Sequence, residues 1–234
     1  MMIRLNPASF RRWALAALIC LSGAIAAIDA AQAQTDQGPV VDFNLFSVKN
    51  MVVGSTIKVD AAFAEKHDMD VPAPFSVIIP TSEDFFTAAR FGPRGDAYMK
   101  ISFATNDKQL IDNMRLVTMT VPLVETEARL KLTAKLLGEQ AFAMAVRGYD
   151  NPQRKGMRKL KIGRYDAVEV IGTYSDPRLG PMYVRLVGIP NPNSQFSVYA
   201  VSNIVARRTK VESADDLTSK TRSGRSLTTF QYLK

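Results

Sequence analysis

Residues 165–206, YDAVEVIGTYSDPRLGPMYVRLVGIPNPNSQFSVYAVSNIVA, decide the fold class. This stretch contains three runs of similar length, at 165–174, 182–189 and 196–206. The runs are rich in Val, Ile, Tyr and Phe, which favour β-strands, and the links between them are dense in Pro, Gly, Asn and Asp, which favour turns. Because links this short join antiparallel neighbours, the stretch predicts a three-strand meander.

Upstream of the meander, the spacing of apolar residues predicts a long amphipathic helix near 125–147. Five apolar residues recur at offsets 0, 4, 7, 11 and 14, namely Leu130, Ala134, Leu137, Ala141 and Met144. This spacing places them on one face of an α-helix. Gly138 lies inside the segment, where we expect it to kink or split the helix.

The remaining elements are shorter. We expect strands at 41–48, 75–80, 98–103 and 115–121, and short helices at 59–66 and 213–219. Thr81 and Ser82 precede two carboxylates, which is typical of a helix start and predicts a brief helix through Arg90. By the same reasoning, we expect Asn106 or Asp107 to begin a helical turn that runs through Asn113. The predicted fold is α+β, an antiparallel sheet with a C-terminal three-strand meander, covered by helices that include the one near 125–147.

The first 33 residues have the three parts of a cleavable signal peptide. Arg4, Arg11 and Arg12 precede an apolar run at 13–28, and Ala33 ends a small-residue stretch that predicts cleavage before Gln34. The apolar run has 16 residues, whereas a membrane-spanning helix needs about 20. We therefore expect a signal peptide at 1–33, a flexible lead at 34–39 and one α+β domain at 40–234, in the periplasm or outside the cell. An uncleaved anchor and export by the twin-arginine route stay open as alternatives.

Removal of the signal peptide changes what the composition implies. The chain has 30 basic and 22 acidic residues, a formal net charge of +8, and the mature part keeps a net charge of about +6. Cys20 and Trp13 leave with the signal, so the mature domain is predicted to be cysteine-free and stabilised by its core alone. Outside the cytoplasm, positive charge favours an envelope protein or an anionic membrane surface as partner rather than nucleic acid.

Catalytic and metal-binding patterns are sparse. A chain whose single histidine is His67, and whose mature part has no cysteine, offers few ligands to zinc or copper. Residues 55–58, STIK, match the S-x-x-K pattern, but the companion S-D-N and K-T-G motifs are missing. Phosphate-binding glycine loops are also missing. We therefore predict no catalytic residue, no metal ligand and no cofactor. Two alternatives stay open, a small-ligand carrier with a pocket between helix and sheet and a hydrolase with a dispersed site.

The basic segment at 147–164 is the candidate binding surface. We interpret it as a loop that leads into the meander and presents cations to an anionic partner: Arg154, Lys155, Arg158, Lys159, Lys161 and Arg164. A solvated connection with no binding role is the alternative.

The order of elements resembles a known family. A strand at 75–80, a strand at 98–103, the amphipathic helix and the segment IGRYDAV at 162–168 before the meander are similar in pattern to the PsbP/DcrB-like α+β sandwich proteins. The pattern covers about two-thirds of the mature chain and leaves residues 221–225 without a place in it. The resemblance implies an antiparallel sheet covered by helices and a non-catalytic accessory role in a larger assembly. The function we predict is that of a non-catalytic exported envelope protein that acts through a surface.

Overall fold

The computed structural model describes residues 41–42, 51–92 and 97–234, and every structural statement below concerns these residues. All of them fall in one compact unit, residues 31–234. The signal peptide, the flexible lead and most of the strand expected at 41–48 lie outside the described residues.

A seven-stranded antiparallel sheet forms the larger layer, with the strand order β4-β5-β6-β10-β9-β8-β7. Its strands are β4 (Phe86–Phe91), β5 (Ala97–Ala104), β6 (Leu110–Thr120), β7 (Asp150–Ile162), β8 (Tyr165–Asp176), β9 (Gly180–Ile189) and β10 (Phe196–Val205). The predicted meander is confirmed, because β8, β9 and β10 are consecutive antiparallel neighbours.

A smaller antiparallel sheet has the order β1-β2-β3-β11. It consists of β1 (Val41–Asp42), β2 (Met51–Val59), β3 (Phe75–Thr81) and β11 (Gln231–Tyr232). The helices are α2 (Ala61–His67), α3 (Thr126–Lys135), the π-helix η3 (Leu136–Ala141), α4 (Phe142–Ala145), the 3-10 turn η4 (Ala206–Arg208), α5 (Asp216–Ser219) and α6 (Arg222–Thr228). The α+β fold class with an antiparallel sheet is confirmed.

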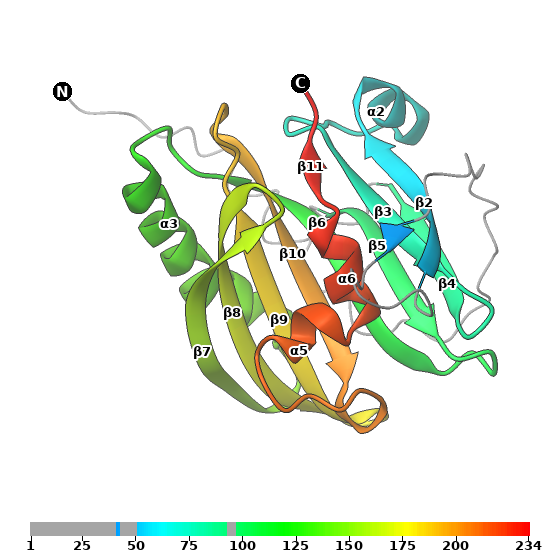
Figure 1. Cartoon of the computed structure of the whole chain (residues 1–234). Coiled ribbons are helices and arrows are strands. Elements are labelled where there is room, and N and C mark those ends of the chain that lie inside the picture. The colour runs from blue at the N-terminus through cyan, green and yellow to red at the C-terminus, as the bar shows by residue number, and fades with distance from the viewer. Residues whose placement is uncertain (1–40, 43–50, 93–96) are drawn as a thin grey trace. The chain divides into compact units, whose positions relative to one another are not determined.

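The two faces of the large sheet pack against different layers. One face, which carries Ile101 and Leu116, shares a core with Phe75 and Val77 of the small sheet, and we call it the sandwich face. The other face shares a core with the helical segment and carries residues such as Val117 and Leu186; we call it the helix face. Figure 1 shows α5, α6 and β11 on one side of the large sheet, and α3 near its β7 and β8 end.

The predicted long helix is present as α3, η3 and α4 in succession. The Glu125 carboxylate accepts hydrogen bonds from the first free amides, at 2.8 Å from the Ala128 nitrogen, and so begins the helix. Gly138, where we expect a kink, lies in the π-helical segment. A Cβ at Gly188 would come within 2.5 Å of Thr133, and one at Gly172 within 2.4 Å of Phe142. Two glycines therefore let the helix approach β9 and β8 closely.

Two predicted helical turns are wrong. Residues 86–91 form β4, and the Ser82 hydroxyl accepts a hydrogen bond from the Asp84 amide in the turn that joins β3 to β4. Likewise β6 begins at Leu110, after a turn in which the Thr105 hydroxyl accepts a hydrogen bond from the Gln109 amide. Short hydroxyl and carboxylate side chains make the same local bonds in turns as at helix starts, so the pattern is ambiguous.

The loop expected in the basic segment is also wrong, because residues 150–162 form the edge strand β7. Its pairing with β8 shifts register twice, between Asp150 and Gln153 and between Arg154 and Gly156. Charged residues and such irregularities are features that protect an edge strand from pairing with another chain. Edge position therefore explains a strand with so many Lys and Arg residues.

The C-terminal segment closes the sandwich and gives the tail at 221–225 its place. The Thr221 hydroxyl accepts a hydrogen bond from the Gly224 amide and begins α6. Asp112 of β6 is fully buried and accepts bonds from the amides of Arg222 and Ser223, at 3.0 and 3.2 Å. Burial raises the pKa of Asp112 to about 6. The Tyr232 hydroxyl accepts from the Val198 amide and donates to a carbonyl of β9, which joins the last strand to the meander.

Candidate functional site

Strand alternation on β7 divides three of the six predicted basic residues between the two faces of the large sheet. Arg158 lies on the sandwich face, where its guanidinium is 2.5 Å from Glu169 and 2.7 Å from Asp215. Lys159 and Lys161 point to the opposite face, where Lys159 pairs with Glu127 and Lys161 pairs with Asp166. Three of the six predicted cations are thus already neutralised by carboxylates.

The other three predicted cations have polar or aromatic neighbours. Arg154 donates to the Gly138 carbonyl oxygen at 3.1 Å, and the Lys155 ammonium donates to the Gln153 side chain. The Arg164 guanidinium lies 5.2 Å from the centre of the Tyr165 ring. The structure therefore does not bring the six together into one free cationic surface. Ala33 and Gln34, the predicted cleavage site, lie outside the described residues.

Strand pairing brings together a different set of cations. Arg90 on β4 lies directly opposite Lys100 on β5, and Lys100 lies directly opposite Arg115 on β6. All three alternate with core residues of the sandwich face and therefore point to the helix face. We call Arg90, Lys100 and Arg115 the cationic row.

The cationic row carries unneutralised charge at short spacing. Adjacent strands lie about 4.8 Å apart, and like charges directly opposite each other destabilise a sheet. Arg90 and Arg115 are exposed and Lys100 is half-buried. Burial and the two arginines lower the pKa of Lys100. Within residues 41–42, 51–92 and 97–234, no carboxylate forms an ion pair with any of the three.

Uncharged polar groups adjoin the cationic row. Ser102, Asn113 and Asn203 lie opposite one another one step along the same face. The Asn203 amide donates to Asn113 at 3.2 Å, and the Tyr174 hydroxyl donates to Asn203 at 3.0 Å. These groups carry no charge, so within the described residues they do not neutralise the row, and polar surroundings of this kind suit an anionic ligand.

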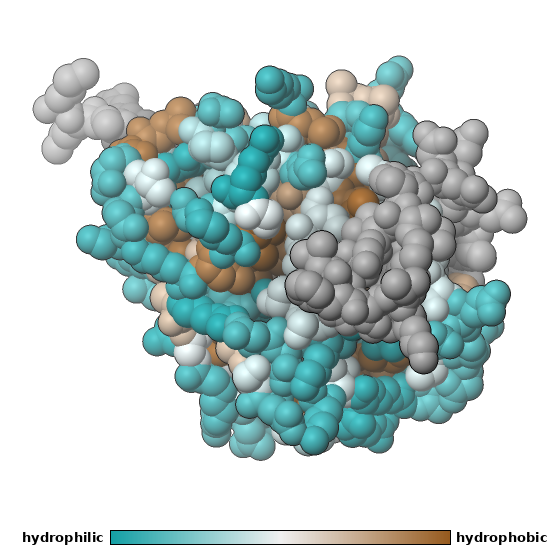
Figure 2. All heavy atoms as spheres, in the orientation of Figure 1, coloured by the Kyte–Doolittle hydropathy of each residue, from teal (hydrophilic) through white to brown (hydrophobic). Residues whose placement is uncertain are grey.

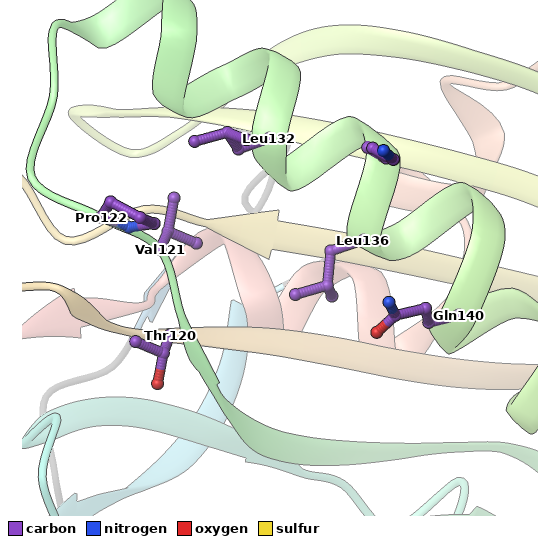
Figure 3. A pocket seen from close by; sticks show the side chains of 7 residues that line it. Thr120, Val121, Pro122, Leu132, Leu136 and Gln140 are labelled. Atoms are coloured by element: carbon purple, nitrogen blue, oxygen red, sulfur yellow. The ribbon is translucent and has the colours of Figure 1, made fainter. Parts of the chain in front are cut away.

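An apolar groove adjoins the far end of β6, between that strand and the helix. It encloses about 200 Å³ and is lined by Thr120, Val121, Pro122, Leu132, Leu136 and Gln140, with Lys135 beside them. Figure 3 shows Leu132 and Leu136 pointing from the helix toward Val121 and Pro122. Leu132 is 43 % exposed, and Leu123 next to Pro122 is 59 % exposed. On the face drawn in Figure 2, hydrophobic residues reach the surface in small separate patches.

Two cavities lined by described residues are small for an enclosed ligand. Besides the apolar groove, a second cavity of about 110 Å³ is lined by residues that include Arg129, Tyr165 and Pro190. Sites that enclose a drug-sized molecule measure about 300–1,000 Å³. Neither cavity therefore favours the small-ligand carrier.

Two features of the sequence bear on catalysis, the S-x-x-K match at 55–58 and the single histidine, His67. Ser55 and Lys58 lie on β2, where residues three apart point to opposite faces, so the lysine does not face the serine hydroxyl. The His67 ring packs 4.4 Å from Phe63 and 5.2 Å from Phe91, and burial lowers its pKa. The described residues contain no group of three or more His, Cys, Asp or Glu side chains that could hold a metal ion. Of the helices in the described part of the chain, none has the length and apolarity to cross a membrane.

The cationic row is not evident from the sequence. Lys100 interrupts the apolar run at 98–103, and Arg115 begins the run at 115–121. A charged residue within a strand indicates that the strand face it points to is exposed to solvent. Each of the three cations, however, lies on a different strand. Only the register of three strands places them side by side.

Comparisons with known proteins give similarity of fold alone. No family model matches the chain, and no curated protein matches it. Among solved structures, the cyanobacterial PsbP protein of Synechocystis is 10 % identical, with a TM-score of 0.46 over 81 % of this chain and 99 % of its own. LpqN, involved in cell envelope biogenesis of Mycobacterium tuberculosis, is 12 % identical, with a TM-score of 0.46 over 77 % and 92 % of the two chains. The Ran-binding protein Mog1p of Saccharomyces cerevisiae is 6 % identical, with a TM-score of 0.38 over 77 % of this chain and 95 % of its own.

All three TM-scores are below 0.5, so these structures carry no argument about this chain. Function has to be argued from the side chains of this chain.

Proposed function

We propose that this protein is an exported, non-catalytic module of the cell envelope that binds an anionic partner at the cationic row. Arg90, Lys100 and Arg115 lie side by side and form no ion pair with a carboxylate of the described residues, and this observation carries the proposal. The sequence supports export through the signal peptide at 1–33, and the positive net charge of the mature chain supports an anionic partner.

An anion bound at the row relieves a repulsion that the free protein has to tolerate. Arginine binds a carboxylate or phosphate through two parallel hydrogen bonds, and lysine adds a compact positive charge. Exposed arginines at both ends of the row leave their guanidinium groups accessible, with Lys100 between them. The row therefore suits two or three anionic groups held close together.

The basic residues of β7 remain the rival surface, and charge-matched variants separate the two. The row variant carries Arg90→Gln, Lys100→Gln and Arg115→Gln. The β7 variant carries Arg154→Gln and Lys155→Gln on β7 and Arg164→Gln in the turn after it, the three predicted cations without carboxylate partners among the described residues. Both sets remove three positive charges, so a difference between them reflects position on the surface.

The test is a pull-down from envelope extracts of the source organism, with the mature chain from Gln34 as bait. We expect the row variant to recover at least about tenfold less of the partner that high salt releases. A tenfold decrease in affinity corresponds to a loss of about 1.4 kcal/mol in binding free energy. The β7 variant should retain the partner. If the row variant recovers the same partner in the same amount, the row is not the binding site; loss in the β7 variant alone transfers the role to β7.

A further inference from the structure

We infer that the anionic partner binds as an extended acidic segment, which pairs with the outer edge of β4 as a further strand of the large sheet. This inference rests on the proposed function and names the form of its partner. Three features of β4 carry it: its place at the margin of the sheet, its lack of edge protection and its position at the end of the cationic row.

The first feature is the place of β4 in the sheet. It pairs with β5 on one side and has no strand partner on the other side among the described residues. Figure 1 shows β4 at one margin of the large sheet and β7 at the other. A strand at the margin directs every second N–H and C=O outward, where they can pair with another strand. Residues 86–91 are half-buried or exposed, and none is buried.

The second feature is a difference in protection between the two edges. Six of the thirteen residues of β7 are charged, and its pairing with β8 shifts register twice. By contrast, β4 (FTAARF) has a single charged residue, Arg90, and pairs with β5 in unbroken register. Charges, prolines and bulges are the devices that keep an edge strand from pairing with other chains. The large sheet is therefore protected at β7 and suited to strand addition at β4.

The third feature is that Arg90 forms the outer end of the cationic row. A strand added to β4 lies about 4.8 Å beyond it, the spacing that separates the strands of the row. The residue directly opposite Arg90 points, like Arg90, to the helix face. An Asp or Glu at this position forms a favourable cross-strand pair with Arg90 and faces Lys100 on the strand behind it. The row therefore selects an acidic segment.

The other end of β4 favours an apolar residue. Phe86 precedes Arg90 by four positions, shares its face and is half-buried. Its ring belongs to neither of the two core clusters. An apolar side chain on the added strand would cover it. Glu83 and Asp84, exposed in the turn before β4, repel a carboxylate at this end. We therefore expect an acidic and an apolar residue four positions apart in the bound segment.

A short segment of a partner fits this edge better than a second copy of this chain. Pairing of two β4 strands would engage six residues of each copy, whereas stable interfaces between folded proteins engage roughly 20–30 residues a side. Strand addition by an extended peptide gains its affinity from main-chain hydrogen bonds along a short edge. A second copy is accordingly an outcome that the experiment must be able to detect.

The first experiment removes one outward amide of β4 and repeats the pull-down. Successive amides of a strand point to opposite sides, so either Thr87→Pro or Ala88→Pro removes an N–H at the open edge and leaves the pairing with β5 intact. Urea denaturation identifies this edge variant, because the other proline breaks a bond to β5 and lowers the midpoint. Lys155→Pro is the control, a proline in the irregular part of β7.

We expect the edge variant to recover at least tenfold less partner and Lys155→Pro to recover the natural amount. If the edge variant retains the partner and the row variant loses it, strand addition is overturned and the proposed function stands. If both variants retain the partner, both proposals fail. Loss in the edge variant alone refutes the role of the row and therefore the acidic segment.

The second experiment identifies the segment without a proline. A photoreactive amino acid at Ala88 in the full chain, expressed in its own host, should give at least tenfold more peptide adduct than one at Met157. Met157 is the matched control, because it is exposed and lies on the helix face of the other edge strand. The captured peptide should carry the acidic and apolar residues at the spacing given above.

A synthetic peptide of the captured segment then tests how it binds. It should slow hydrogen exchange of alternate β4 amides at least tenfold and leave the amides of β7 unchanged. Its Kd should increase at least tenfold with the row variant. A lipid adduct, a segment of this chain itself, or a peptide that binds without protecting β4 would overturn the inference.

Discussion

Replacing Lys100 with Met should make the free protein more stable, although most substitutions in a sheet destabilise it. Lys100 lies directly opposite Arg90 on one side and Arg115 on the other. Each cross-strand pair contributes about 0.2–1 kcal/mol, so removal of two repulsions should raise the free energy of unfolding by about 0.4–2 kcal/mol. Met preserves the length and the apolar stem of the half-buried lysine, so packing changes little.

The assay is urea denaturation at low salt and in about 1 M NaCl, where the Debye length falls to about 3 Å. With a denaturant slope of about 2 kcal/mol per molar, the midpoint of Lys100→Met should rise by about 0.2–1 M at low salt. The gain should shrink at high salt. Lys159→Met is the control, because Lys159 pairs with Glu127 at the surface and its removal should cost about 0–1 kcal/mol. A lower midpoint for Lys100→Met at low salt would refute the reasoning.

Three further predictions concern other parts of the chain. Glu169→Gln should lower the free energy of unfolding by about 3–5 kcal/mol, because it leaves the buried Arg185 without its carboxylate at 2.5 Å. Adding Arg185→Met to the same chain should recover most of this loss of unfolding free energy, as measured in urea titrations. A loss under about 1 kcal/mol for Glu169→Gln alone contradicts the role of Glu169 as the carboxylate that neutralises Arg185. The folded state raises the pKa of Asp112 to about 6 and so binds its proton more tightly than the unfolded state. The stabilisation from this proton is complete below about pH 4 and is lost as the pH rises through about 6, so relative to Asp112→Asn the natural protein should lose roughly 3 kcal/mol between pH 4 and 7. A difference in unfolding free energy that does not vary with pH argues against this shift. Sequencing of the mature N-terminus should begin at Gln34, and an intact Met1 shows an uncleaved anchor instead.

The sequence predicts the elements whose local pattern and tertiary role agree. The meander and the helix near 125–147 are such elements, because residue types, spacing and turn formers all favour the same structure. Residues 81–90 show the opposite case. Thr81 and Ser82 before two carboxylates suit a helix start and a tight turn equally, and pairing with β5 decides for the strand β4.

For the segment 150–162, the prediction of a loop is wrong for a different reason. Its cations and Gly156 lower its strand propensity, but an edge strand is the position where a sheet tolerates and benefits from them. The cationic row illustrates the further limit of local patterns. Each of its three residues is an ordinary charge within its own strand, and the site exists only through the register between strands.

The pairing of β11 with β3 bears on when this protein can fold. The sandwich closes only when residues 231–232 reach β3, more than 150 positions earlier in the chain, and Tyr232 reaches the meander. Contacts of such long range make folding slow. As long as a ribosome or a secretion channel still holds residues 231–232, this closure cannot form. Late closure favours the export that we propose, since general secretion carries polypeptides that have not yet acquired their tertiary structure.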